Sequence, residues 1–244
     1  MHPPDYIAER FLPARKLTEN DPLCWLEYDE GSSIHRVCVV NYDRRRSGNF
    51  YRLAGAISSL GLKIRSADIN LLLGPIMFFA MQFEDTENRE GELSQWRQKE
   101  ICEKVIDTIS GKLTGPPRFR KKWGQSESKA LQLSRPEINV KTNNSSVNHA
   151  TIIDVFAYDK PGLLYQISKK IYRLGLDVTG ARVSTYAHQI IDVFYVTDED
   201  GNKIRNQNQL QIIRKQLLQA VTEFLEADDG DPVKSAETTP EHTS

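Results

Sequence analysis

Apolar positions between residues 150 and 201 follow the order strand, turn, helix, strand, strand. β-branched and aromatic residues are nearly continuous from Thr151 to Tyr158, which predicts a strand covered on both faces. The tetrapeptide 159–162, Asp-Lys-Pro-Gly, then breaks this run. Proline is tolerated in a first helical turn, and glycine allows close backbone approach, so a helix is predicted to begin there.

The helix is predicted to end at Gly175, which suits a C-cap. Two further strands follow over 176–183 and 190–196, joined by a hairpin connection at Ala187-His188. A last helix is predicted from about Gln207 to Leu225. The apolar stripe of the first helix is Leu164, Ile167, Ile171 and Leu174, and that of the last is Leu210, Ile213, Leu217, Val221 and Phe224 or Leu225.

The same pattern occurs earlier in the chain, as an internal repeat. Aligning Gly61-Leu62 with Gly175-Leu176 gives an offset of 114 residues. At this offset Gly48 falls on Gly162, Phe50 on Leu164, Ile57 on Ile171, Ile64 on Val178, Ala67 on Ala181, and Met77, Phe79 and Met81 on Ile191, Val193 and Tyr195. The offset becomes 116 where Asp43 meets Asp159, which places a two-residue insertion within Arg44–Ser47. We therefore predict two copies of one fold.

Three segments resemble the ACT domain: 159–164 (DKPGLL), 175–178 (GLDV) and 193–198 (VFYVTD). More closely, they resemble the paired ACT domains at the C-terminal regulatory end of the bacterial PII uridylyltransferase/uridylyl-removing enzyme. The resemblance covers most of residues 30 to 225, and 136–140 resembles the strand preceding the second ACT copy. It implies an α+β fold of two ferredoxin-like βαββαβ modules, whose antiparallel sheets are packed by helices on one face.

The catalytic motifs of the resembled enzyme are not found in this sequence. Neither the nucleotidyltransferase motif with paired aspartates nor the His-Asp phosphohydrolase ligands occur, and the five histidines show no metal-ligand spacing. We therefore expect no catalytic residues, no cofactor and no metal. The chain is interpreted as a stand-alone regulatory pair or one product of a split gene.

Composition restricts the partners and the compartment. A formal net charge of −1 gives no electrostatic basis for binding nucleic acid or a membrane. The sequence has an odd number of cysteines, without CxxC spacing: Cys24, Cys38 and Cys102. Reduced thiols in a cytosolic setting are therefore expected. Neither a signal peptide nor a long apolar run occurs, and a cytoplasmic protein is predicted.

The predicted domain limits follow composition. They are an N-terminal extension over 1–30, a first ACT-like domain over 31–112, a linker over 113–135, a second ACT domain over 136–226 and a disordered acidic tail over 227–244. The linker contains a basic run, 118–122, interpreted as a solvated connector or as a contact for an acidic partner.

The turn at 159–162 is the candidate ligand site. The amides of Gly162 and Leu163 lie at a helix N-terminus that favours a carboxylate, and Asp159 can accept from an ammonium. The resemblance implies an effector between two copies, held by this turn and a polar residue early in the second strand, here Asp177. The candidates are Asp159, Lys160, Pro161, Gly162, Leu163, Leu164, Asp177 and Val178 in the second copy and Asp43, Gly48 and Lys63 in the first. Alternatively, these residues only build a tight turn.

The resemblance implies a tandem ACT regulatory protein that binds an amino acid, glutamine in particular, and signals nitrogen status. The ligand would bridge two ACT sheets and favour one arrangement of them. Two alternatives stay open: a detached regulatory part acting with a separate catalytic subunit, and a ligand-free dimerisation module. The expected partners are the amino acid, a catalytic or PII-type signalling protein, and a second copy paired through the ACT sheets.

Overall fold

A computed structural model describes residues 22–42, 48–71, 76–87, 91–113, 115–119, 137–186 and 189–227. The first module comprises β1 (Leu23–Asp29), β2 (Ile34–Tyr42), α2 (Asn49–Ser59), β3 (Leu62–Leu71), β4 (Ile76–Asp85) and α3 (Gln95–Ile109). The second comprises β5 (Asn139–Asn143), β6 (Thr151–Tyr158), α5 (Leu163–Arg173), β7 (Asp177–Arg182), β8 (Thr185–Tyr186), β9 (Gln189–Thr197) and α6 (Gln207–Glu226).

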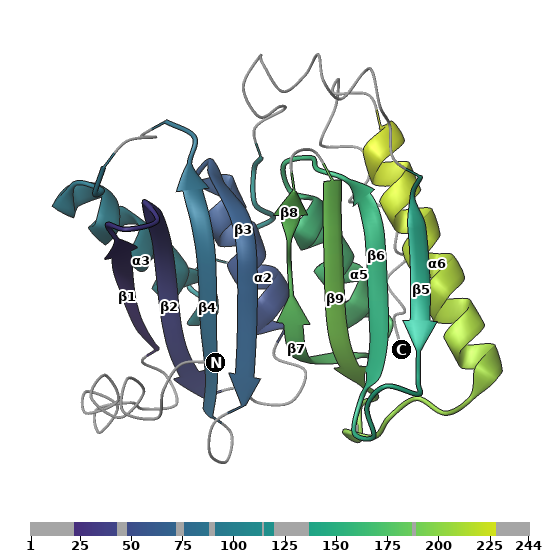
Figure 1. The fold of residues 1–244 in the computed structure, drawn as a ribbon. Coiled ribbons are helices and arrows are strands. Elements are labelled where there is room, and N and C mark those ends of the chain that lie inside the picture. Colours follow the sequence, from purple (N-terminus) through teal and green to yellow (C-terminus); the bar gives the residue numbers. More distant parts are fainter. Residues whose placement is uncertain are drawn as a thin grey trace, which may run out of the picture.

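The strands of both modules form one antiparallel sheet with the helices on one face (Figure 1). The sheet has nine strands in the order β1-β2-β4-β3-β7-β9-β6-β5, with β8 paired to β9. The predicted α+β class of ferredoxin-like modules is therefore confirmed, but the strand that the βαββαβ order places after the last helix of each module comes before the other strands instead. The two sheets are joined into one because β3 pairs with β7. In each module the outer edge strand, β1 or β5, precedes the other strands in the sequence.

Strand β1 lies in the segment that the sequence assigned to the N-terminal extension. It pairs with β2 along its whole length, from Leu23 opposite Val40 to Asp29 opposite Ile34. Sheet pairing therefore begins before residue 31. Of the other predicted segments, the hairpin connection at 187–188 and the basic residues 120–122 lie outside the described residues.

The internal repeat is confirmed at the helices. Helices α2 and α5 each contain 11 residues and stand 114 residues apart. Each begins after a left-handed glycine, Gly48 at φ 66° and Gly162 at φ 86°. A residue with a Cβ adopts this conformation rarely, so the glycine in both turns has a backbone reason.

The predicted alignment of the last strand in each copy was wrong by one residue. Val39 pairs with Phe79 in the first module, and the equivalent Val155 pairs with Asp192 in the second. Phe79 therefore corresponds to Asp192, and not to Val193. A one-residue slip moves every side chain of a strand to the opposite face. Accordingly Ile191, predicted to repeat a core position, is 45% exposed.

The predicted apolar stripe of the last helix is confirmed, because Leu210, Ile213, Leu217, Val221 and Leu225 are buried in the core.

The linker residues 115–119 approach the helices. Phe119 contacts Tyr165 of α5, with ring centroids 5.4 Å apart. A Cβ on Gly55 of α2 would lie 3.0 Å from the ring of Pro117. This part of the linker therefore packs along the α2–α5 junction, while the side chain of Arg118 is exposed.

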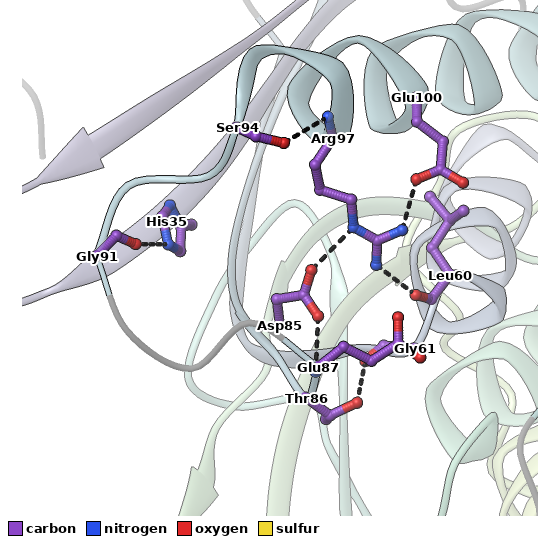
Figure 2. Close-up of polar contacts among 10 residues, drawn as sticks. All are labelled: His35, Leu60, Gly61, Asp85, Thr86, Glu87, Gly91, Ser94, Arg97 and Glu100. Carbon is purple, nitrogen blue, oxygen red and sulfur yellow. Dashed lines mark hydrogen bonds and ion pairs between the residues drawn. The ribbon is translucent and has the colours of Figure 1, made fainter.

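A buried arginine joins three elements of the first module (Figure 2). Arg97 of α3 donates to the Asp85 carboxylate at 2.9 Å, to Glu100 at 2.6 Å and to the Leu60 carbonyl at the end of α2 at 2.7 Å. Three charge-assisted bonds compensate the burial of this guanidinium. The network ties the end of β4 and the start of α3 to the end of α2.

Candidate functional site

The predicted turn of the second module faces the first module. Asp159 follows β6, and its Oδ2 atom lies 3.0 Å from Nζ of Lys63 at the start of β3. The Lys63 residue is only 2% exposed. Two predicted site residues from different copies are therefore brought together in an ion pair that is shielded from water, although Asp159 Oδ2 makes no hydrogen bond of normal geometry within the described residues.

A small cavity lies beside this ion pair, at the junction of the modules. It has a volume of about 20 Å³, enough for a single water molecule. The second module contributes Asp159, Lys160, Gly162, Leu163, Leu164, Val183, Thr185, Ile190 and Asp192, and the first contributes Ser58 and Ile64. We call it cavity 1. A free amino acid is larger than this space, so the walls must separate to admit one.

A second cavity of about 20 Å³ lies at the corresponding place in the repeat. It is formed by the turn of the first module and the start of β7 in the second, with Gly48, Asn49, Phe50, Tyr51, Phe79, Ser168, Tyr172, Leu176, Asp177 and Val178. We call it cavity 2. Ile64 of cavity 1 and Val178 of cavity 2 stand 114 residues apart, as do Gly162 and Gly48. The two cavities are therefore related by the internal repeat.

The site residues predicted for the second copy are divided between the two cavities. Asp159, Gly162, Leu163 and Leu164 line cavity 1, whereas Asp177 and Val178 line cavity 2. The residue that meets the second turn is Lys63, which holds the place of Asp177 in the repeat. Sequence reasoning identified both sets of residues, but the division between the cavities depends on how the modules pair.

Of the remaining predicted residues, Lys160 binds the end of α6 with its side chain. Its Nζ donates to the carbonyls of Phe224 and Ala227, both at 3.0 Å, at the end of α6. A cation at the C-terminus of a helix is stabilising there. The side chain thus ties the turn to α6. Pro161 is buried within the turn and lines neither cavity, and Asp43 lies outside the described residues.

The Leu163 amide of the turn, which the sequence predicted to bind a carboxylate, is already hydrogen-bonded in the structure. The Leu163 N–H donates to the Lys160 carbonyl at 3.0 Å, so in this structure it is not available to an anion. The next amides along the helix, at Leu164 and Tyr165, belong to the first turn, whose donors a helix cannot satisfy internally. An anion at this end of α5 would meet these amides and the positive end of the helix dipole.

Asp192 is the cavity residue that the sequence reasoning missed. It lies on β9 and is 1% exposed, and neither of its carboxylate oxygens has a hydrogen-bond partner of normal geometry among the described residues. Burial raises the pKa of this carboxyl well above its usual value, with a smaller contribution from the charge of Asp159, while the Ser184 amide lowers it. A carboxylate within an otherwise apolar strand was the available sequence signal.

Neither a metal-ligand cluster nor a membrane-spanning helix occurs within the described residues. No group of three or more His, Cys, Asp or Glu side chains within them is arranged to hold a metal ion. Within the same residues, no helix is both long enough and apolar enough to cross a membrane.

Comparison with known proteins gives one family match to the second module and several longer relatives. Residues 146–223 match the sequence model of the ACR family N-terminal ACT domain, so the second module is an ACT domain. The bifunctional uridylyltransferase/uridylyl-removing enzyme of Azospirillum brasilense is 30% identical over 217 residues, which is 89% of this chain and 22% of the enzyme. The enzyme of the same name from Rhodospirillum rubrum is 28% identical over 197 residues, 80% of this chain and 20% of the enzyme.

The chain therefore spans about a fifth of the length of these relatives. Among solved structures, aspartate kinase from Synechocystis aligns with a TM-score of 0.41 and 8% identity, over 89% of this chain and 38% of the kinase. The relation to the uridylyltransferases rests on the sequence matches.

Proposed function

We propose that this chain, whose second module is an ACT domain, is a regulatory protein that binds a free amino acid between its two modules. The observation that carries the proposal is the Lys63–Asp159 pair beside cavity 1. ACT domains generally bind small amino acid effectors, and the two opposite charges at this junction match the two charges of an amino acid. The turn that would bind the ligand belongs to one module and the lysine belongs to the other.

Binding would exchange one ion pair for two. The ammonium group of the amino acid would contact Asp159, and its carboxylate would contact Lys63 and the first-turn amides of α5. Charge-assisted hydrogen bonds of this kind are about twice as strong as neutral ones. Because cavity 1 holds only about 20 Å³ in the present state, the ligand must move the turn away from β3. Effector binding is thereby linked to the relative position of the modules.

This linkage supports a signalling role. A ligand shifts an equilibrium between two arrangements only through its different affinity for them, and an opened junction would provide that difference. By relation to the uridylyltransferases we assign glutamine as the effector and nitrogen status as the signal, in the cytoplasm. The partner would be a catalytic or PII-type signalling protein that senses the arrangement of the modules.

A thermal-shift screen of the full chain against the twenty amino acids tests the proposal. A ligand specific for the folded state at 100 times its Kd stabilises it by about 2.7 kcal/mol. We expect glutamine to raise the midpoint of the wild type and not that of Asp159→Asn. Lys99→Met, which removes an exposed lysine paired with Glu103 on α3, is the matched control and should respond as the wild type does. If no amino acid shifts the wild-type midpoint, the chain is not an amino acid sensor.

A further inference from the structure

The two cavities between the modules differ at one central position. Each cavity is lined by one residue or more of an inner strand, β4 in cavity 2 and β9 in cavity 1. The strand registers place Phe79 of cavity 2 at the position that Asp192 has in cavity 1. Both residues are buried, at 2% and 1% exposure. The same place in one fold thus holds a phenyl ring in one copy and a carboxyl group in the other.

The carboxyl group is not required for packing. A buried polar group without a hydrogen bond destabilises a fold, and neither oxygen of Asp192 has a partner of normal geometry among the described residues. Phe79 occupies the equivalent position with an apolar side chain, so the fold accepts one there. A residue that weakens the fold where an apolar one is tolerated is best explained by a function.

The surroundings define what could bind to it. Asp159 on the 159–162 turn and Asp192 on β9 both line cavity 1, and Lys63 of β3 is paired with Asp159. The hydroxyl-bearing residues Ser58 and Thr185 line the same cavity. Two carboxyl groups and one lysine suit a ligand that brings a positive nitrogen to the carboxyl groups and a negative group to the lysine.

We propose that Asp192 is a ligand-binding and specificity-determining residue of cavity 1 that accepts hydrogen bonds from the ammonium group of the effector. The proposal rests on the amino acid binding proposed above and assigns the cavity that selects for the ammonium. Asp159 holds this group from the turn, and Asp192 holds it from the sheet. Cavity 2 has Phe79 in this place and Asp177 in the place of Lys63, so it does not offer the same recognition.

Calorimetric titration of the full chain with L-glutamine and with N-acetyl-L-glutamine tests this assignment. The acetyl group removes the ammonium charge and keeps the carboxylate and the side-chain amide. We expect the wild type to bind glutamine and to discriminate against the acetylated form. Asp192→Asn should weaken glutamine binding by about 10- to 100-fold, the range for loss of a hydrogen bond to a charged group, and should reduce the discrimination. Phe79→Leu is the matched control in cavity 2 and should leave this binding unchanged.

Thermal unfolding of the ligand-free proteins separates a binding role from a structural one. If Asp192 serves the ligand, Asp192→Asn and Asp192→Leu unfold at or above the wild-type midpoint, because a buried carboxyl group without a hydrogen bond of normal geometry is removed. A lower midpoint in both variants would show that Asp192 supports the fold and would overturn the proposal. Equal glutamine affinity in wild type and Asp192→Asn would overturn it too, while amino acid binding itself would stand. A wild type that binds no amino acid would overturn both.

Discussion

The ammonium nitrogen of Lys63 lies 3.0 Å from the carboxylate of Asp159, and these two residues belong to different copies of the internal repeat. Lys63 is the second residue of β3 in the first module, and Asp159 follows β6 of the second. The ion pair stands beside β3–β7, the strand pair that joins the two half-sheets. Any ligand that competes for either charge therefore acts at the junction of the modules.

Loss of Lys63 should destabilise the chain through the charge that remains. Lys63→Met leaves the Asp159 carboxylate, whose side chain is 11% exposed, without its partner. Breaking a buried pair in this way costs about 3–5 kcal/mol, and the residual exposure of Asp159 favours the lower end. Urea unfolding measures this value. The double variant Lys63→Met/Asp159→Leu should recover most of the loss; if it is as unstable as the sum of the single changes, the pair is not coupled.

Alanine at Gly162 should be more harmful than alanine at Gly175. Both glycines have positive φ, 86° and 74°, so each change costs about 1–2 kcal/mol in backbone energy. A Cβ on Gly162 would also lie 2.7 Å from the ring of Phe119, whereas at Gly175 the nearest atom is the movable Oε1 of Glu199 at 2.8 Å. Chemical denaturation of the two variants checks this order.

The added cost at Gly162 can be assigned by a second change. Phe119→Ala removes the ring that a Cβ would meet, so Gly162→Ala should be less destabilising in that background than in the wild type. An unchanged cost would mean that the backbone conformation alone is responsible and that the linker does not press on the turn.

His35 should make the chain less stable in mild acid. Its ring is stacked between Tyr28 and Phe83. Burial lowers the pKa of His35, against the raising effects of the Gly91 carbonyl and the charges of Asp85 and Glu92. The unfolded chain then binds more protons than the folded one below the unfolded pKa of about 6.5, and stability is lost as the pH falls through that window. Urea midpoints between pH 7.5 and 5 should decline less in His35→Phe, and an equal decline would contradict this assignment.

Asp192 should have a pH effect of the opposite sign. Its pKa in the folded protein is raised, first by burial, so the folded chain binds more protons than the unfolded one. Stability from this group is present below the unfolded pKa of about 3.9 and is lost as the pH rises toward the folded pKa. The difference in stability between Asp192→Asn and the wild type should therefore grow with pH. A constant difference would show that Asp192 ionises alike in both states.

The sequence predicted those features that depend on local pattern. The helix after Gly162 and the last helix were found because apolar residues recur at helical spacing, and the start of the first of them because Pro161-Gly162 breaks the preceding strand. Strand β1 was missed because the segment 23–29 was assigned to the N-terminal extension, before the predicted first domain at residue 31. The repeat was found by aligning Gly61 with Gly175, which both have positive φ, 76° and 74°.

The site was predicted only in part because it depends on long-range pairing. The copies differ by one residue in the connection before β4 and β9, and this difference conceals the match between Phe79 and Asp192. That Lys63 meets Asp159, and not the turn of its own module, follows from the pairing of β3 with β7. Local periodicity contains no information about such contacts.

Calorimetric titration of L-glutamine into the wild type and Asp159→Asn tests whether the Asp159 carboxylate binds the effector. We expect saturable binding to the wild type, at least about 10-fold weaker binding to Asp159→Asn because a charge-assisted contact is lost, and wild-type affinity in Lys99→Met. Equal affinity in the wild type and Asp159→Asn, or no binding of glutamine to the wild type, would contradict it.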